Sequence, residues 1–391
     1  MLLFCSACSD SDIGPNPSRQ AKRHVTLTFS PGQARTRTAA DEFRIDDINL
    51  YLFPTGGGPA RHLHLSSQRS VVLELPEGDY ALYAVANAGA DMGGQTQEYV
   101  RSLRFDRDPD ALADGPLPMS VEQTVSVRGD MHIDVTLVRA VAKIDFSCTV
   151  AAEFAPELEI KSVRICNAPC SVSFFAPSRA TTSGDVADTT PDAAPGQTFS
   201  ASYYLLENRQ GTVAGIGSQE GKNQTVAPEK ATYIYIEGEA DGVKVAYRIY
   251  PGENNTTDFN IVRNRVYNID ARILGMNTVD WRVSTAEVAV TPFAERYAPG
   301  ASASATLELV STNDAHNEFY LTYLLDAGQG TVAIDGERRT AGTPYPLLCG
   351  NGTATAEIAY TQDTPGDVRL RLVVTDRYGF GMERELTTVY K

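Results

Sequence analysis

Apolar and polar residues alternate with a period of two along most of this sequence. Residues 24–29, 46–53 and 243–250 show the pattern clearly, and it places successive side chains on opposite faces of an extended strand. Helical periodicity is almost absent, and residues 96–103 hold the one helix that we expect in the first domain. Glycine and proline turns, such as residues 76–78, separate the strands. This pattern predicts an all-β chain made of β-sandwiches.

The strand pattern also divides the chain, whose 391 residues exceed the size of one small domain. Residues 21–154 and 155–283 each form a block of alternating strands. Residues 179–197 are rich in Ser, Thr, Asp, Ala and Pro, and we expect a long exposed loop there. Residues 284–391 predict a third, immunoglobulin-like sandwich, with strand candidates at 306–310, 319–324, 355–360 and 368–376.

Composition and charge narrow the classes of function. Apolar residues make up 42% of the chain, which is enough for packed cores. The formal net charge is −15 and the sequence pI is about 4.8. This acidity argues against binding to nucleic acid or to an anionic membrane surface, since both require a basic patch. No apolar run approaches the ~20 residues of a membrane-spanning helix.

The sequence offers little for catalysis. It has no G-x-S-x-G, no H-E-x-x-H and no P-loop, so we predict a non-enzymatic protein without a cofactor or metal. Cys166 and Cys170 could be half of a zinc site, but no second ligand pair lies nearby. Two separate thiols or one short-range disulfide remain as interpretations of that pair. His62 and His64 share one side of a strand without a matching acidic partner, and we interpret them as surface residues.

The opening twelve residues, MLLFCSACSDSD, resemble the end of a bacterial lipoprotein signal. Cys8 is the predicted lipidation site, because small Ala7 precedes it whereas bulky Phe4 precedes Cys5. The acidic run after Cys8 resembles a surface-export signal of such lipoproteins. Residues 1–20 are thus predicted to be a truncated signal and a tether. The predicted location is the outer membrane, with an acylated, for instance palmitoylated, cysteine.

Several segments resemble the fimbrillin superfamily, the pilus subunits of anaerobic Gram-negative bacteria. They are IDDINLYLFPTGG (45–57), LPEGDYALYAVAN (75–87), LVRAVAKIDF (137–146) and DFNIVRNRVYNIDARI (258–273). YLLENRQG (204–211) resembles a domain of unknown function of the same group. The resemblance spans about residues 25–283 and implies two tandem transthyretin-like β-sandwiches.

The resemblance also implies partners, namely other fimbrial subunits that assemble by β-strand exchange. The first strand would be exchanged, with Val25, Leu27 and Phe29 on its inner face. A first strand that is unpaired or at a replaceable edge would support exchange, whereas its burial together with an inaccessible segment 35–37 would count against it. Proteolysis after Arg35 or Arg37 would free it. An ordinary polar loop around these arginines is the alternative.

The third domain is a departure from repeating stalk subunits and favours a terminal place in a fimbria. A tip subunit would bind a host or bacterial surface ligand, whereas an anchor would keep its lipid on Cys8. The alternative function is a surface glycan-binding lipoprotein of a polysaccharide-uptake system. The single tryptophan of the chain argues against it, because glycan sites favour clustered aromatic residues.

Overall fold

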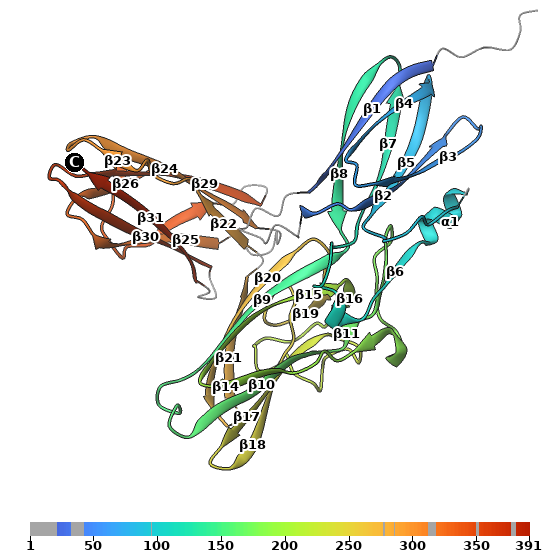
Figure 1. Ribbon diagram of the computed structural model, residues 1–391. Helices are drawn as coiled ribbons and strands as arrows, with labels where there is room; N and C mark the ends of the chain where they lie inside the picture. Colours follow the sequence, from blue (N-terminus) through green and yellow to red (C-terminus); the bar gives the residue numbers. More distant parts are fainter. Residues whose placement is uncertain are drawn as a thin grey trace, which may run out of the picture.

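The structure is a computed structural model that describes residues 22–32, 43–94, 96–276, 278–284, 286–311, 318–348, 352–376 and 381–391. These residues form three β-sandwiches in chain order (Figure 1). Within this described part, no helix has the length and apolar character needed to cross a bilayer. The prediction of an all-β chain with three sandwiches is confirmed.

The first sandwich is one continuous hydrogen-bonded order of seven strands, β3-β2-β5-β7-β8-β1-β4, whose two halves, β3-β2-β5-β7 and β8-β1-β4, enclose one core. Strands β7 and β8 join the two halves only through Met119 and Ser120. An insertion between β5 and β7 carries the short helix α1 (Gln97–Ser102), as predicted, with Thr96 as its N-cap. The strands are β1 (Lys22–Pro31), β2 (Asp47–Pro54), β3 (Arg61–Ser66), β4 (Ser70–Pro76), β5 (Gly78–Ala86), β6 (Arg104–Asp106), β7 (Met119–Val127) and β8 (Met131–Arg139).

The second sandwich packs sheet β14-β10-β17-β18 against sheet β15-β9-β20-β21. Its main strands are β9 (Val141–Val150), β10 (Leu158–Cys166), β14 (Asp192–Gly196), β15 (Thr198–Leu206), β17 (Tyr233–Ala240), β18 (Val243–Ile249), β20 (Val266–Gly275) and β21 (Thr278–Ser284). Short strands border them, namely β11 (Ala168–Pro169), β12 (Ser171–Ser173), β13 (Val186–Ala187), β16 (Asn208–Thr212) and β19 (Asp258–Ile261).

The two sandwiches repeat one topology. The first strand of each, β1 or β9, is parallel to the last main strand, β8 or β20, and antiparallel to β4 or β15. The facing sheets also correspond, with β3-β2-β5-β7 in one and β14-β10-β17-β18 in the other. The second sandwich adds β21 beside β20. This is the transthyretin-like arrangement that the resemblance implied.

The start of the second sandwich and the predicted loop 179–197 differ from the sequence-based expectation. Strand β9 pairs with β15 and β20, so the chain enters the second sandwich at Ala140 rather than at 154/155. The sequence gives no signal of this change of sandwich, because only Ala140 separates β8 from β9 and no glycine or proline turn lies between them. The predicted loop 179–197 contains β14, which pairs with β10 at the edge of a sheet.

The third sandwich has two five-stranded sheets, β22-β24-β29-β26-β27 and β23-β31-β30-β25-β28. Its first strand is divided between the sheets, and β23 runs parallel to the last strand β31, which fits the predicted immunoglobulin-like architecture. The strands are β22 (Ala286–Val290), β23 (Arg296–Tyr297), β24 (Ser302–Ser311), β25 (Glu318–Ala327), β26 (Thr331–Ile334), β27 (Glu337–Arg338), β28 (Tyr345–Leu348), β29 (Thr353–Thr361), β30 (Gly366–Asp376) and β31 (Gly381–Tyr390). All four predicted strands lie within these elements.

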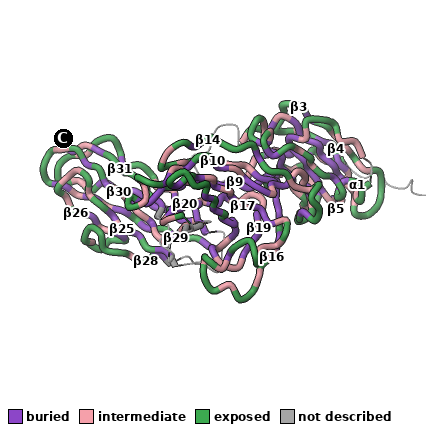
Figure 2. Tube along the Cα trace, turned by 90° about the horizontal axis from the view of Figure 1, so that it is seen from below, coloured by how far each residue is buried: buried purple, intermediate pink, exposed green. Residues whose placement is uncertain are grey.

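Buried residues run along the inside of each sandwich (Figure 2). The first two sandwiches also share buried side chains at their junction. Strand β6 of the first pairs with β12 of the second. One apolar cluster crosses the junction and consists of Leu112, Leu117, Ala140, Val141, Val172 and Leu206. These contacts make the first two sandwiches a packed pair.

Candidate functional site

Strand β1 holds the predicted assembly residues, and it lies inside its sheet. Val25 is opposite Leu73 of β4 on one side and opposite Met131 of β8 on the other. Val25, Leu27 and Phe29 are all buried in the core of the first sandwich. Strand β1 is therefore neither unpaired nor at an edge of its sheet, because both sets of its backbone groups are paired, so it lacks the edge position that would have supported exchange. Alternation explains the burial, since these three side chains share one face.

The chain joins β1 to the rest of the sandwich only from its C-terminal end, through residues 33–42. At this end the Phe29 amide donates to the carbonyl oxygen of Arg69, and the Gly32 amide donates to that of Leu137, both at 2.7 Å. Without β1, strands β4 and β8 would each expose a row of backbone donors and acceptors. Three apolar pockets at alternate positions would open between them. Such a slot accepts an extended strand by main-chain pairing and side-chain register.

The remaining predicted site residues have different outcomes. Cys8, Arg35 and Arg37 lie outside the described residues. Arg139 lies at the end of β8, where the chain passes from the first sandwich to the second. Its Nε donates to Oδ1 of Asn264 in the second sandwich at 3.3 Å. Arg139 thus contacts the second sandwich across the junction.

A buried ion pair lies on the second-sandwich side of this junction. Burial opposes the charge of Glu207, but hydrogen bonds from Arg263 and Arg209 outweigh it and lower the pKa of the carboxyl group. Arg263 also donates from Nη1 to the carbonyl oxygen of Phe174 at 2.9 Å. The same oxygen accepts from Ser120 of β7 at 2.6 Å. Glu207 therefore fixes the loop that meets the first sandwich.

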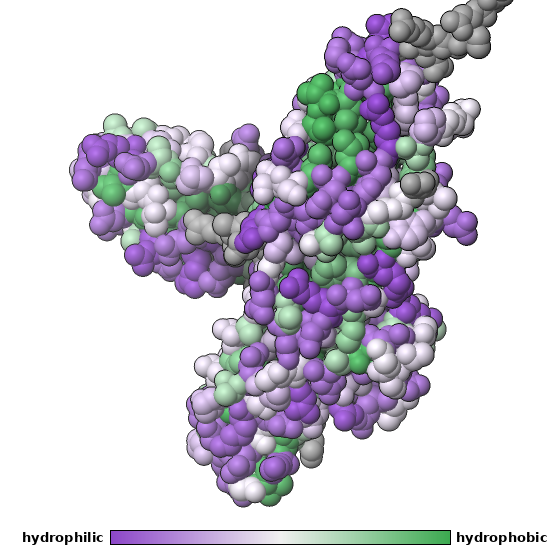
Figure 3. Space-filling view, turned by 45° about the vertical axis from the view of Figure 1, so that its right-hand side comes forward, coloured by the Kyte–Doolittle hydropathy of each residue, from purple (hydrophilic) through white to green (hydrophobic). Residues whose placement is uncertain are grey.

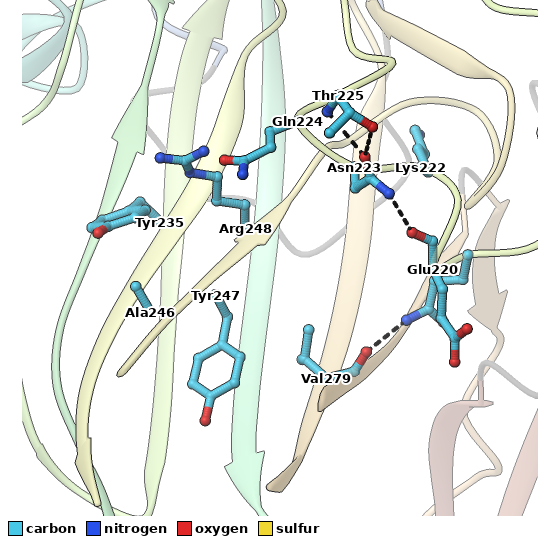
Figure 4. A pocket seen from close by; sticks show the side chains of 11 residues that line it. Glu220, Lys222, Asn223, Gln224, Thr225, Tyr235, Ala246, Tyr247, Arg248 and Val279 are labelled. Atoms are coloured by element: carbon cyan, nitrogen blue, oxygen red, sulfur yellow. Dashed lines mark hydrogen bonds between the residues drawn. The ribbon is translucent and has the colours of Figure 1, made fainter. Parts of the chain in front are cut away.

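A second candidate site is a hollow of about 850 Å³ beside β18 in the second sandwich (Figure 4). One wall is formed by Tyr235 and Arg248 on β17 and β18, and the other by the segment 219–225. Sequence reasoning missed it. The available signal was the polar face of two alternating strands, where Tyr233, Tyr235 and Arg248 fall on one side.

The described cysteines and histidines are not gathered into a metal cluster. Cys148, Cys166 and Cys170 are free thiols, so the short-range disulfide is absent from these described positions. His62 stacks on Tyr51 with ring centroids 4.4 Å apart. His64 Nε2 lies 4.0 Å from Oδ1 of Asp47. Among the described residues, no group of three or more His, Cys, Asp or Glu side chains is placed to hold a metal ion.

Comparison with protein families gives one partial match. Residues 203–271 match a family described as a domain of unknown function (DUF4906). The match includes residues 204–211, whose sequence resembles such a domain, and most of the hollow beside β18. The chain matches no protein in the search of curated proteins.

Solved structures give likenesses over about two-thirds of the chain. A proposed cell adhesion protein from Bacteroides eggerthii is 15% identical, with a TM-score of 0.48, over 69% of this chain and 97% of that one. A fimbrillin from Porphyromonas gingivalis is 17% identical, with a TM-score of 0.48, over 66% and 91%. A fimbrial assembly protein from Parabacteroides distasonis is 13% identical, with a TM-score of 0.40, over 68% and 96%. Fimbrillins and adhesion proteins are thus among the solved structures that this chain is similar to.

Proposed function

We propose that this protein is a non-enzymatic subunit of a bacterial surface fimbria, acting in adhesion and in assembly with other subunits by β-strand exchange. It would occupy a terminal place, as tip or as outer-membrane anchor. The immunoglobulin-like third sandwich supports a terminal place. A stalk subunit would end soon after its second sandwich, whereas this chain continues with a third. The fimbrillin-like motifs support a location at the cell surface.

The observation that carries this proposal is the position of β1. It is the first described strand, it fills a slot between β4 and β8, and only residues 33–42 connect it to β2. One cut in that connection would leave β1 held by noncovalent contacts alone. A strand from another subunit could then pair with the same two neighbours. Arg35 and Arg37 are the proposed processing sites.

The test replaces residues 35–38 by a site for a specific protease and adds a labelled peptide of residues 22–32 after cleavage. We expect the peptide to replace β1, and a peptide with aspartate at positions 25, 27 and 29 to fail. The uncut chain is the control and should take up no peptide. If the cut chain never takes up the native peptide, even after partial unfolding and refolding, strand exchange at this slot is wrong.

The N-terminus of protein isolated from outer membranes distinguishes the two terminal roles. An acylated Cys8 at an intact N-terminus would mark an anchor. A chain that begins at Thr36 or Thr38 would mark a processed subunit. An unacylated, unprocessed chain in the cytoplasm would contradict the proposed surface location altogether.

The alternative function, a glycan-binding surface lipoprotein, is favoured by one observation. The hollow beside β18 combines an arginine, tyrosines and amide side chains within reach of a single ligand. The chemistry of that hollow leads to a more specific inference.

A further inference from the structure

Three side chains form a row across the outer face of one sheet in the second sandwich. Arg164 of β10, Tyr235 of β17 and Arg248 of β18 lie directly opposite one another in the strand register. Their neighbours Ile234 and Ile236 are buried in the core, so Tyr235 points to the outside. The Cζ atom of Arg164 lies 4.5 Å from the centroid of the Tyr235 ring. Two guanidinium groups therefore flank one aromatic ring in a protein of net charge −15.

The two arginines differ in their remaining partners. Nη1 of Arg164 lies 3.5 Å from Oε1 of Glu237, which balances its charge. Arg248 lies 5.5 Å from the ring centroid of Tyr233 and 5.7 Å from that of Tyr235. None of the ion pairs between described residues includes Arg248. Contacts with ring faces hold a guanidinium in place and leave its N–H groups for an acceptor. Arg248 is thus a positioned cation in the lining of the hollow.

The opposite wall of the hollow is built by a segment with its own hydrogen bonds. Oδ1 of Asn223 accepts from the amide and the hydroxyl of Thr225 at 2.9 and 2.6 Å. Nε2 of Gln219 donates to the carbonyl oxygen of Val279 on β21 at 2.8 Å. These bonds fix the shape of the segment and attach it to β21, so this wall is formed before any ligand enters. Figure 4 shows the side chains of Gln224 and Arg248 reaching the hollow from opposite elements.

The polar groups of the hollow fit a ligand that carries both an anionic group and hydroxyl groups. Arg248 supplies donors and positive charge, which suit a carboxylate. The carbonyl oxygen of Gln224 and the carboxylate of Glu220 are acceptors and suit hydroxyl groups. A sulfate has no hydroxyl donor for those acceptors at neutral pH, and a hydrogen phosphate has at most two. A bound peptide strand would use apolar pockets for alternate side chains, and such pockets are scarce in this lining.

We propose that this hollow binds a saccharide that carries a carboxylate, with the carboxylate on Arg248 and sugar hydroxyl groups on the side chains of the opposite wall. A volume of about 850 Å³ suits a ligand of two or three sugar rings. Tyr233 and Tyr235 position the guanidinium rather than stack on the sugar. This inference rests on the proposed surface role, in which the second sandwich meets glycans outside the cell.

The test is calorimetry of the full chain with trigalacturonic acid and with sialyllactose, each compared with its methyl ester. We expect at least one acid to bind and its ester to bind about tenfold or more weakly, because the ester has lost the charge. Arg248→Gln should weaken binding of the acid by a similar factor without changing binding of the ester. Arg272→Gln, an exposed arginine on β20 of the other sheet, is the matched control and should bind as the native chain does.

Other outcomes would overturn the proposal. Equal binding of acid and ester, native affinity in Arg248→Gln, or no binding of either acid would each do so. Tighter binding of a glutamate-rich peptide than of both saccharides would assign the hollow to a peptide instead. None of these results bears on strand exchange at β1, because that is measured with the peptide of residues 22–32. Failure of this site is therefore distinguishable from failure of the proposed assembly role.

Discussion

Arg263 donates from Nη2 to Oε2 of Glu207 at 2.7 Å, and no part of the Glu207 side chain is exposed to solvent. The pair connects the end of β15 to the loop before β20, next to the junction with the first sandwich. Removing one member of a buried ion pair leaves the other charge without compensation. This geometry yields two of the predictions that follow.

Arg263→Met is expected to destabilise the protein by about 3–5 kcal/mol, because it leaves the buried carboxylate of Glu207 with fewer donors. Urea unfolding of the second sandwich, followed by tyrosine fluorescence or circular dichroism, measures the loss. Arg272→Met is the control, since Arg272 and Glu153 form an exposed pair at 3.7 Å worth about 0–1 kcal/mol. Equal losses of stability in the two variants would contradict a larger contribution of the buried pair to the free energy of unfolding.

The lowered pKa of Glu207 predicts an acid-sensitive stability. A carboxyl group with a lower pKa in the folded state stabilises that state above the unfolded pKa of about 4.5. This contribution is lost as the pH falls below that value toward the folded pKa. Glu207→Gln removes the titrating group, so the free energy of unfolding of the variant should fall less steeply with acid than that of the native chain. Parallel pH profiles would contradict this prediction.

Phe29→Ala should destabilise the first sandwich by about 3–5 kcal/mol, because it opens a cavity in a fully packed core. The substitution should also speed the release of β1 after cleavage of residues 33–42. Ser30→Ala, at the neighbouring exposed position, is the control and should have little effect. Thermal unfolding and peptide uptake measure the two effects, and an unchanged melting temperature in Phe29→Ala would contradict the position of β1.

The free thiols should differ in reactivity. Burial, with a smaller contribution from Asp270, raises the pKa of the Cys148 thiol to about 12. Cys170 is only partly buried. Since the thiolate is the reacting form, iodoacetamide should label Cys170 in the folded protein and Cys148 only after unfolding in urea. Peptide mass spectrometry measures both. Labelling of Cys148 at the rate of Cys170 under native conditions would contradict the packing of β9.

Gly330→Ala should destabilise the third sandwich by about 1–3 kcal/mol. A Cβ atom at this position would lie 2.6 Å from Cζ of Tyr360 and closer still to the carbonyl oxygen of Thr361. The hydroxyl group of Tyr360 also accepts from the Gly330 amide at 2.8 Å, so the ring cannot move away without losing that bond. Gly217→Ala is the control, because nothing lies within 4 Å of its added Cβ. Equal stability of the two variants would contradict the close approach at Gly330.

The surface of the first sandwich indicates where its core is least covered. Val121, Met131 and Ile133 border that core and are only partly buried. Figure 3 shows hydrophobic side chains gathered on the outside of this sandwich. In the second sandwich, β21 covers the corresponding side of β20. The difference follows from topology, since the chain leaves β8 directly into β9 and forms no further strand there.

Local pattern alone determined much of this protein. Alternation at residues 24–29 was enough to place Val25, Leu27 and Phe29 on one buried face, because strand periodicity is a property of the backbone. Turns such as residues 76–78 separated the strands, and Thr96 marked the start of the helix. The three sandwiches followed from the same local signals.

Only the tertiary structure decided how distant strands pair. The interior position of β1 depends on its pairing with β4 and β8, and the residues of β1 alone do not indicate which strands will pair with it. The transfer of β9 to the second sandwich depends on its parallel partner β20, more than a hundred residues later. The row of Arg164, Tyr235 and Arg248 exists because three strands align in register. Register between strands is a long-range property, set by shared burial of whole faces, and for that reason one strand's pattern could not reveal it.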